Sequence, residues 1–201
     1  MNNENINILR KHYNNHIYPK PTEDIKKEFI EKNKVLYADP NFSWHKLWPE
    51  KKYSTEQLSI LIAGCGSDQA AILAMCNPRH DFVGVDLSKK SLDHQNKLIK
   101  KHQIKNLTLF CNDFRLLKFD KKFDYIISTG VIHHLDDPSS ALKYFNDNLN
   151  EDGVIDLMVY GDKKSYAITQ LKKIFNKLNL NQDLSSINLA KNIVNKLHNK
   201  H

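Results

Sequence analysis

Ser59-Ile-Leu-Ile-Ala-Gly-Cys-Gly-Ser67 is the stretch of this sequence that decides the fold. Its apolar residues 60–62 predict a short buried strand, and Gly64-Cys-Gly66 predicts a turn too tight for large side chains. The residues from Ser67 to Met75 favour a helix. A strand, a glycine turn and a helix in this order bring backbone N–H groups and a helix N-terminus close to a ligand. The sequence therefore predicts a ligand site at this turn, with bare amides facing the ligand.

A second apolar run indicates the same kind of site. Phe82-Val-Gly-Val85 predicts a strand that ends in Asp86, twenty residues after Gly66. In α/β nucleotide folds, an acid at about this offset holds the ribose hydroxyls. A glycine pair or a strand ending in Asp is weak evidence when alone, because ordinary turns contain both. Together, within a repeating strand–helix pattern, they predict an adenosine-type cofactor.

Strands and helices alternate from residue 58 to residue 160. The strands are predicted over 59–63, 82–86, 107–111, 125–129 and 154–160, and the helices over 67–76, 88–102 and 138–149. This alternation implies a mostly parallel sheet with right-handed crossovers. We expect an α/β fold, a Rossmann-like three-layer sandwich with at least five strands. Asp68 and Ser88 are predicted to cap the first two of these helices.

The two ends of the chain lack this alternation. Residues 3–14 and 22–33 predict short helices, and 35–57 predict a loop containing Trp44 and Trp48. These tryptophans either pack beneath the helices, which we favour, or cover a substrate pocket. Residues 163–179 and 185–198 predict two amphipathic helices, for which packing onto the domain is favoured over a membrane-surface role. We expect three segments: an N-terminal helical and loop segment over 1–57 that could serve as a lid, a cofactor-binding core over 58–160, and a C-terminal helical segment over 161–201.

Composition excludes several classes of protein. The chain has 201 residues, 40% hydrophobic and 26% charged, which suits one α/β domain with a little extra. The formal net charge is +7, but the lysines recur in scattered pairs that predict solvated faces. Nucleic acid is therefore not the expected partner, although an RNA-directed enzyme stays an alternative. The N-terminus lacks an apolar leader and no apolar run approaches a membrane span, so we expect a cytoplasmic protein with no membrane partner.

No metal site is expected. The three cysteines, Cys65, Cys76 and Cys111, have neither the even count nor the spacing of a disulfide framework or a zinc site. The adjacent side chains of His133 and His134 point apart on a helix or strand, so they would not chelate one ion together.

The residues around the turns separate two classes of nucleotide enzyme. A Rossmann dehydrogenase usually has a third glycine at the position of Gln69. The absence of this glycine disfavours an NAD-dependent oxidoreductase. After the third strand, the carboxylate of Asp113 could accept from an adenine amine and Phe114 could offer an apolar face. The alternative is a turn aspartate beside a core phenylalanine.

Six motifs, in this order along the chain, are typical of one enzyme family: Leu61-Ile-Ala-Gly-Cys-Gly66, Val83-Gly-Val-Asp-Leu-Ser88, Asn112-Asp-Phe114, Phe123-Asp124, Thr129-Gly-Val-Ile-His-His-Leu135 and Glu151-Asp-Gly153. With these motifs the chain resembles the class I S-adenosylmethionine-dependent methyltransferases. Two stretches, Gly64-Cys-Gly-Ser-Asp-Gln-Ala-Ala71 and Leu157-Met-Val-Tyr160, resemble more narrowly a bacterial branch of small-molecule methyltransferases. The resemblance implies S-adenosylmethionine as cofactor, S-adenosylhomocysteine as product, and no metal. It also implies a role for each matching position. The methionine part of the cofactor would lie over residues Ala63, Gly64, Cys65 and Gly66. Asp86 would hold the ribose, Leu87 would lie against the adenine, and the adenine edge would be framed by Asp113 and Phe114. The site near the sulfonium would be closed by Thr129 and Gly130.

The sequence departs from the family in three places. Ile62 stands where the family often has an acid that fixes the methionine amino group, and Asp68 stands where a glycine is expected. Asp68 could supply the missing carboxylate, but the helix cap is the favoured interpretation. The family normally adds two strands after the fifth, and nothing past Tyr160 alternates like a strand. We therefore expect either that these strands are missing, or that the chain is a shortened form completed by another polypeptide.

The catalytic candidates are His133 and Tyr160, which follow the fourth and fifth strands. Packing at the loop–helix junction is the alternative for His133, and a half-buried sheet edge is the alternative for Tyr160. We expect methyl transfer to an oxygen, nitrogen or carbon atom of a small molecule. The alternative is a non-catalytic, cofactor-binding partner subunit, and a partner chain or a homodimer stays open.

Overall fold

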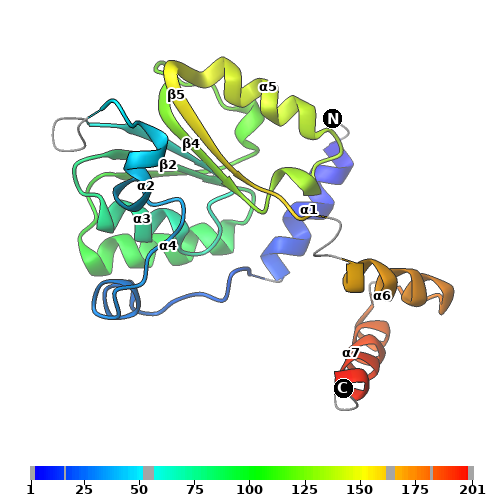
Figure 1. Cartoon of the computed structure of the whole chain (residues 1–201). Coiled ribbons are helices and arrows are strands. Elements are labelled where there is room, and N and C mark those ends of the chain that lie inside the picture. Colours follow the sequence, from blue (N-terminus) through cyan, green and yellow to red (C-terminus); the bar gives the residue numbers. More distant parts are fainter. Residues whose placement is uncertain (1–2, 16, 52–56, 162–165, 182, 199–201) are drawn as a thin grey trace. The chain divides into compact units, whose positions relative to one another are not determined.

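A computed structural model describes residues 3–15, 17–51, 57–161, 166–181 and 183–198 of the protein. The chain divides into two compact units, Met1–Val159 and Tyr160–His201. The first unit holds a five-stranded sheet of order β3-β2-β1-β4-β5, in which every neighbouring pair is parallel (Figure 1). The predicted Rossmann-like α/β fold is confirmed.

The strands follow the apolar runs of the sequence. They are β1 (Ser59–Ala63), β2 (Asp81–Asp86), β3 (Leu107–Cys111), β4 (Phe123–Thr129) and β5 (Leu149–Met158). The first four agree with the predictions to within two residues. β5 was predicted to begin at residue 154, after a turn, but its ladder already starts where Phe123 pairs with Leu149. A shift in register between Phe123 and Tyr125 absorbs the extra residues.

Helices cover both faces of the sheet, so its central strands are apolar on both sides. α3 (Gln69–Cys76) and α4 (Lys89–His102) lie on one face, and α5 (Pro138–Asn148) lies on the other (Figure 1). On the first face, Ile60 and Ile62 share a core with Leu73. On the second face, Leu61 and Ile126 share a core with Phe145. Two short 3₁₀ helices, η2 (Phe114–Leu116) and η3 (Ile132–His134), follow β3 and β4.

The N-terminal segment differs in part from the prediction. α1 (Asn3–Asn15) forms as expected, but the helix predicted over 22–33 is reduced to a short π-helix, η1 (Lys26–Ile30). α2 (Pro40–Leu47) lies inside the stretch predicted to be a loop. Two features of the sequence mark the start of α2. Asp39 caps the helix by accepting from Asn41 N at 2.9 Å, and Pro40 lies in the first turn.

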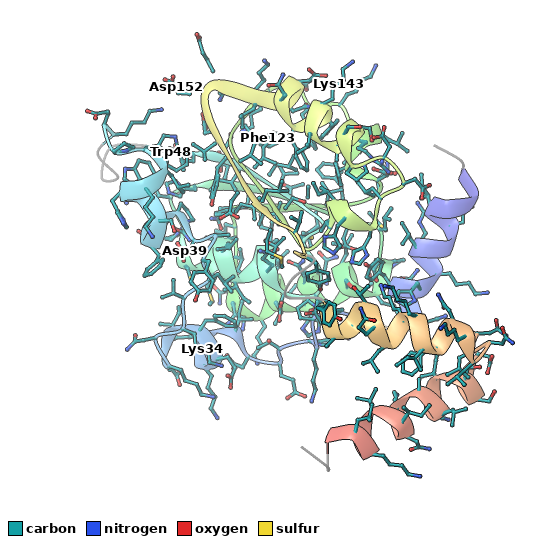
Figure 2. All side chains as sticks on the ribbon, turned by 45° about the vertical axis from the view of Figure 1, so that its right-hand side comes forward. Lys34, Asp39, Trp48, Phe123, Lys143 and Asp152 are labelled. Carbon is teal, nitrogen blue, oxygen red and sulfur yellow. The ribbon has the colours of Figure 1, made fainter. Side chains whose placement is uncertain are left out.

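The two tryptophans of this segment are buried at the amino ends of the strands. The rings of Trp44 and Trp48 lie 4.8 Å apart, and Trp48 meets the edge of Tyr125 at 5.5 Å. The indole N–H of Trp48 donates to the carbonyl oxygen of Asp152 at 3.2 Å, and both residues are labelled in Figure 2. The favoured interpretation, that these side chains pack beneath the helices, is confirmed.

The second unit is a pair of helices, α6 (Tyr166–Lys177) and α7 (Leu184–His198). Asn179 adopts a φ of 52° after α6, and Leu180 N donates to Phe175 O at 3.0 Å, which closes the helix end. Asp183 then accepts from Ser186 N at 2.8 Å and starts α7. Both predicted helices are confirmed, although residues 163–165 lie outside the described part.

Candidate functional site

Asp86 lies at the carboxyl end of β2 and points toward the glycine turn. One carboxylate oxygen accepts from Gly66 N at 2.8 Å, and the other accepts from Ser88 N at 2.8 Å. Burial raises the pKa of this carboxyl, and the hydrogen bonds from the Ser88 and Gly66 amides oppose the rise. Because an ionised carboxylate offers about four acceptor positions, lone pairs remain for a ribose diol. Ser88 in turn caps α4 as predicted, since its hydroxyl accepts from Ser91 N at 3.2 Å.

The amides of the glycine turn are not bare, which corrects the prediction made from its sequence. Gly64 N and Cys65 N both donate to Val85 O, at 2.8 and 3.0 Å, and Gly66 N donates to Asp86. These donors are used to join the turn to the end of β2, because buried amides need partners. The turn therefore fixes the position of Asp86 and does not present these three N–H groups to a ligand.

Glycine is required at both positions of the turn for steric reasons. Gly64 has a φ of +83°, and a Cβ there would overlap the side chain of Val131, whose Cγ1 it would meet at 3.0 Å. Gly66 has a φ of +58°, and its Cβ would lie 3.1 Å from Pro19 Cδ and 3.2 Å from Tyr18 O. Side chains rarely adopt such φ values. The turn thus brings η3 and the N-terminal segment close to the end of β1.

Gln95, which was not predicted from the sequence, supports the glycine turn from α4. Its amide nitrogen donates to Gly66 O at 2.8 Å and Cys65 O at 3.3 Å, while its oxygen accepts from Ala71 N at 3.0 Å. The side chain is fully buried. The sequence feature that could have predicted this role is the position of Gln95, a polar residue midway between Leu92 and Leu98 on the inward face of α4.

Cys65 is fully buried, and its sulfur lies 3.1 Å from the side-chain nitrogen of Gln95, which fits the prediction of a turn too tight for large side chains. Burial raises the pKa of the thiol well above its usual value, and the negative charge of Asp86 raises it further. The group is therefore a thiol at neutral pH, whereas a nucleophile needs the thiolate.

Asp68 does not cap α3 with its side chain, so the favoured interpretation of this residue was wrong. It occupies the N-cap position, but its carboxylate accepts from the Thr22 hydroxyl at 2.7 Å. Thr22 was predicted to start a helix and instead ties the N-terminal segment to this turn. Burial raises the pKa of Asp68, and the hydrogen bond from Thr22 opposes the rise.

The N-terminal segment follows the same edge of the sheet. The hydroxyl of Ser67 donates to Pro19 O at 2.9 Å, and that of Ser88 lies 3.3 Å from Tyr13 O. His94 Nε2 lies 3.0 Å from Thr22 O. The segment is thus held beside both the glycine turn and the start of α4.

Gln69 joins the glycine turn to the end of β4. Its amide nitrogen donates to the Thr129 hydroxyl at 3.2 Å. Gly130 follows with a φ of +72°, and its N–H donates to Met158 O at 2.9 Å. In the sequence, Gln69 indicated only that a third glycine is absent, so this bridge was not predicted. The predicted residues Thr129 and Gly130 therefore lie at the carboxyl edge, together with Ala63 at the end of β1.

The predicted adenine pair has partners within the protein. Both carboxylate oxygens of Asp113 accept from Arg115, one of them from Nε at 2.9 Å. Phe114 is 5% exposed and stacks on Phe145 at 5.3 Å. These contacts correspond to the alternative of a turn carboxylate beside a core ring, so an adenine role for the pair stays a prediction. Leu87 is half-buried directly after Asp86.

The two catalytic candidates are placed differently. His133 is half-buried on η3, and burial lowers its pKa. Its ring lies 4.1 Å from that of His134, so the prediction that these two side chains point apart was wrong. A histidine with a lowered pKa is neutral at pH 7 and can accept a proton. Tyr160 is 57% exposed and is the first residue of the second unit, so its role stays a prediction.

No cluster of three or more histidine, cysteine or acidic side chains that could hold a metal ion occurs among the described residues. Within the same residues, no helix combines the length and the apolar character needed to cross a membrane.

Known proteins share the central part of this chain. Residues 61–155 match a family described as a methyltransferase domain. An uncharacterized protein of Rickettsia prowazekii (strain Madrid E) is 35% identical over 103 residues, which are 49% of this chain and 19% of that protein. The malonyl-acyl-carrier-protein O-methyltransferase of Bacillus cereus is 25% identical over 114 residues, which are 56% of this chain and 41% of that protein. The chain therefore spans less than half the length of these relatives.

A solved structure extends the likeness to most of the fold. The plantazolicin methyltransferase BpumL, in complex with SAH, matches with a TM-score of 0.56 and 20% identity, covering 82% of this chain and 64% of that chain. At this identity the likeness concerns the arrangement of strands and helices.

Proposed function

We propose that this chain, a member of the class I S-adenosylmethionine-dependent methyltransferases, binds S-adenosylmethionine and transfers its methyl group to a small molecule. The motifs predicted this family, and the match of residues 61–155 to a methyltransferase domain supports it. One observation carries the proposal: the Asp86 carboxylate is held toward the glycine turn by Gly66 N and Ser88 N. The residues at this edge suit an adenosyl ligand, because an oriented carboxylate and side-chain-free backbone lie together.

Asp86 would hold the ribose hydroxyls, with Leu87 beside the adenine. Asp113 and Phe114 would form the outer wall of the adenine region in a structural role, since Arg115 already uses the Asp113 carboxylate. Ala63, Gly64, Cys65 and Gly66 would run under the methionine part. Residues 17–22, which belong to the predicted lid, would cover this edge, supported by the contacts of Pro19 and Thr22.

Gln69 and Asp68 would receive the ammonium group of the methionine part. β1 ends in Ile62 and Ala63, which cannot accept a hydrogen bond with their side chains. Gln69 reaches Thr129 across the end of the turn, and its side-chain oxygen is an acceptor. We expect Gln69→Ala to weaken S-adenosylhomocysteine about five-fold, roughly 1 kcal/mol, and to leave 5′-methylthioadenosine unchanged, because that compound lacks the amino-acid part.

Calorimetric titration of each protein with both compounds checks this expectation. The matched control is Gln57→Ala, which removes an exposed glutamine just before β1, at the opposite end of the strands. The Gln57 amide donates to the Asp81 carboxylate at 3.4 Å, far from the glycine turn, so this change should alter neither affinity. Equal losses for both ligands in Gln69→Ala would place Gln69 in a general structural role.

When bound, S-adenosylmethionine supplies an electrophilic methyl group. The protein then has to orient the acceptor in line with that group and exclude water. His133 would take the proton that an oxygen or nitrogen acceptor releases, because burial keeps its imidazole neutral. The half-buried position of η3, directly after β4, places this residue at the carboxyl edge.

The acceptor class is proposed from the relative in Bacillus cereus that is named as an O-methyltransferase. Purified protein with labelled S-adenosylmethionine and a panel of small carboxylic acids, phenols and amines tests it. We expect transfer to an oxygen acceptor, with a lower rate and unchanged S-adenosylhomocysteine affinity in His133→Gln. Cofactor binding without transfer to any acceptor would instead support the non-catalytic subunit.

A further inference from the structure

The net positive charge of this chain comes almost entirely from its C-terminal unit, which contains few acidic residues. Residues 160–201 contain eight lysines, no arginine and two aspartates, a net charge of +6 out of +7. The remaining 159 residues, which contain the sheet and the cofactor edge, are therefore nearly neutral at +1. Neither the sheet nor the cofactor edge explains this excess, because it lies outside them.

The same unit carries an apolar face on each helix. Leu171 and Phe175 of α6, and Ile187, Ala190 and Ile193 of α7, are only partly covered, and no residue of α6 is buried. Six further aliphatic side chains, which we call the exposed stripe, are 38–57% accessible: Ile168, Ile174, Leu178, Leu189, Val194 and Leu197. The apolar face of each helix is therefore wider than the contact between α6 and α7, and part of it stays exposed.

Lysines border this apolar face on both helices. At about 100° per residue, Lys172 follows one edge of the apolar face of α6 and Lys177 precedes the other. On α7, Lys191 and Lys196 take the corresponding positions beside Ile187 and Leu189. Lysine can lay its aliphatic stem along apolar surface and keep its ammonium group in a polar layer.

We propose that the C-terminal helix pair binds the surface of an anionic lipid bilayer, with the exposed stripe in the acyl boundary and the bordering lysines among the headgroups. Basic amphipathic helices with aliphatic faces bind bilayers in this way. A second copy of the chain is disfavoured as occupant, because two C-terminal units, each of net charge +6, repel each other. Nucleic acid would pair with the lysines but leaves the aliphatic side chains without partners.

Sedimentation of the full chain with lipid vesicles tests the proposal. We expect binding to phosphatidylcholine vesicles that contain phosphatidylglycerol, weak binding to phosphatidylcholine alone, and a decrease with added salt. No binding to either vesicle by a folded protein would overturn the proposal. Calorimetric affinity for S-adenosylhomocysteine is measured on the same sample, so that a failure of the proposed function is seen separately.

Three variants separate the stripe from general charge. Ile174→Gln with Leu197→Gln should lower vesicle affinity about ten-fold, because both side chains are about half exposed and their loss removes apolar burial in lipid. Replacing Lys172, Lys177, Lys191 and Lys196 by glutamine should lower it more than about ten-fold. The matched control replaces four exposed lysines of the core, Lys100, Lys105, Lys118 and Lys143, and should bind nearly as well as the parent.

Four results would contradict this assignment. Equal losses in the two lysine variants would show that net charge alone drives binding. RNA binding that depends on the exposed stripe would assign the face to nucleic acid. Dimerisation abolished by Ile174→Gln with Leu197→Gln would assign it to a second copy. A large fall in the melting temperature of the core in that variant would assign it to packing on the domain.

Discussion

The two ends of the same five strands are built in opposite ways. At the amino ends, Trp44, Trp48 and His80 are buried against one another, and His80 Nδ1 accepts from Leu58 N at 3.2 Å. At the carboxyl ends, Asp86 and Gln69 connect a glycine turn to neighbouring strands. The amino end is closed by large aromatic rings, whereas the carboxyl end is held by polar groups with unused lone pairs.

This difference separates stability from binding. Both ends must satisfy backbone groups that leave the ladder, because unpaired buried amides are costly. The amino end does so with the indole N–H groups of Trp44 and Trp48, which donate to carbonyl oxygens, and with the ring of His80. The carboxyl end does so with Asp86, a carboxylate that can accept from a ligand as well. Substitutions at the two ends should therefore change different quantities.

Trp48→Ala should produce the largest loss of stability, about 3–5 kcal/mol, because a buried ring next to Tyr125 is removed. The affinity for S-adenosylhomocysteine, measured where the variant is still folded, should stay within about two-fold of the parent. Urea unfolding and calorimetry check the two parts. A selective loss of affinity would show that the amino end takes part in binding.

Gly64→Ala should follow, with a loss of about 2–4 kcal/mol from overpacking and backbone strain. Its Cβ would overlap Val131 Cγ2, at a φ of +83°. Unlike Trp48→Ala, this change should also abolish detectable cofactor binding, because Val131 and the turn must move. The double variant Gly64→Ala with Val131→Ala relieves the contact and should regain part of the stability; no recovery would point to φ alone.

His80 should make the amino end sensitive to acid. Burial, together with the charge of Arg79, lowers the pKa of His80 to about 4, against about 6.5 when unfolded. As pH falls below about 6.5, the unfolded state takes up the proton first, so the folded state loses stability until about pH 4. Between about pH 7 and pH 5 this loss is about 2 kcal/mol.

The matched variant His80→Gln keeps an acceptor for Leu58 N and does not titrate. Urea unfolding at both pH values should show a loss about 2 kcal/mol smaller in the variant than in the parent. The same loss in both proteins would mean that other groups cause the acid sensitivity. Asp86 does not cause this loss of stability at low pH. Because its pKa is raised in the folded state, its protonation stabilises the folded state.

The sequence predicted the sheet better than the contacts of the site. Residues 60–62 and 125–127 are uninterrupted apolar runs, which predict strands buried on both faces of a sheet. α2 was missed because Trp44 and Trp48 were interpreted without the Asp39-Pro40 start signal. At the site, Asp86 was found from its spacing, but Gln95 was missed because its partners lie 24 to 30 residues away.

Local rules misled at Asp68 for the same reason. Its N-cap position was correct, but Thr22, a residue 46 positions earlier, takes the carboxylate in the fold. The bare amides predicted at Gly64 and Cys65 were likewise taken by Val85 O from the adjacent strand. Such contacts depend on tertiary structure, which neither spacing nor propensity encodes.

Calorimetric titration of the parent and of Asp86→Ala with S-adenosylhomocysteine tests the central claim most directly. We expect the parent to bind and the variant to bind about 10- to 100-fold more weakly, as lost charged hydrogen bonds cost roughly 1.5–3 kcal/mol. Circular dichroism of both proteins confirms that each is folded. Equal affinities, or no heat from a folded parent protein, would contradict the assignment of this edge to an adenosyl cofactor.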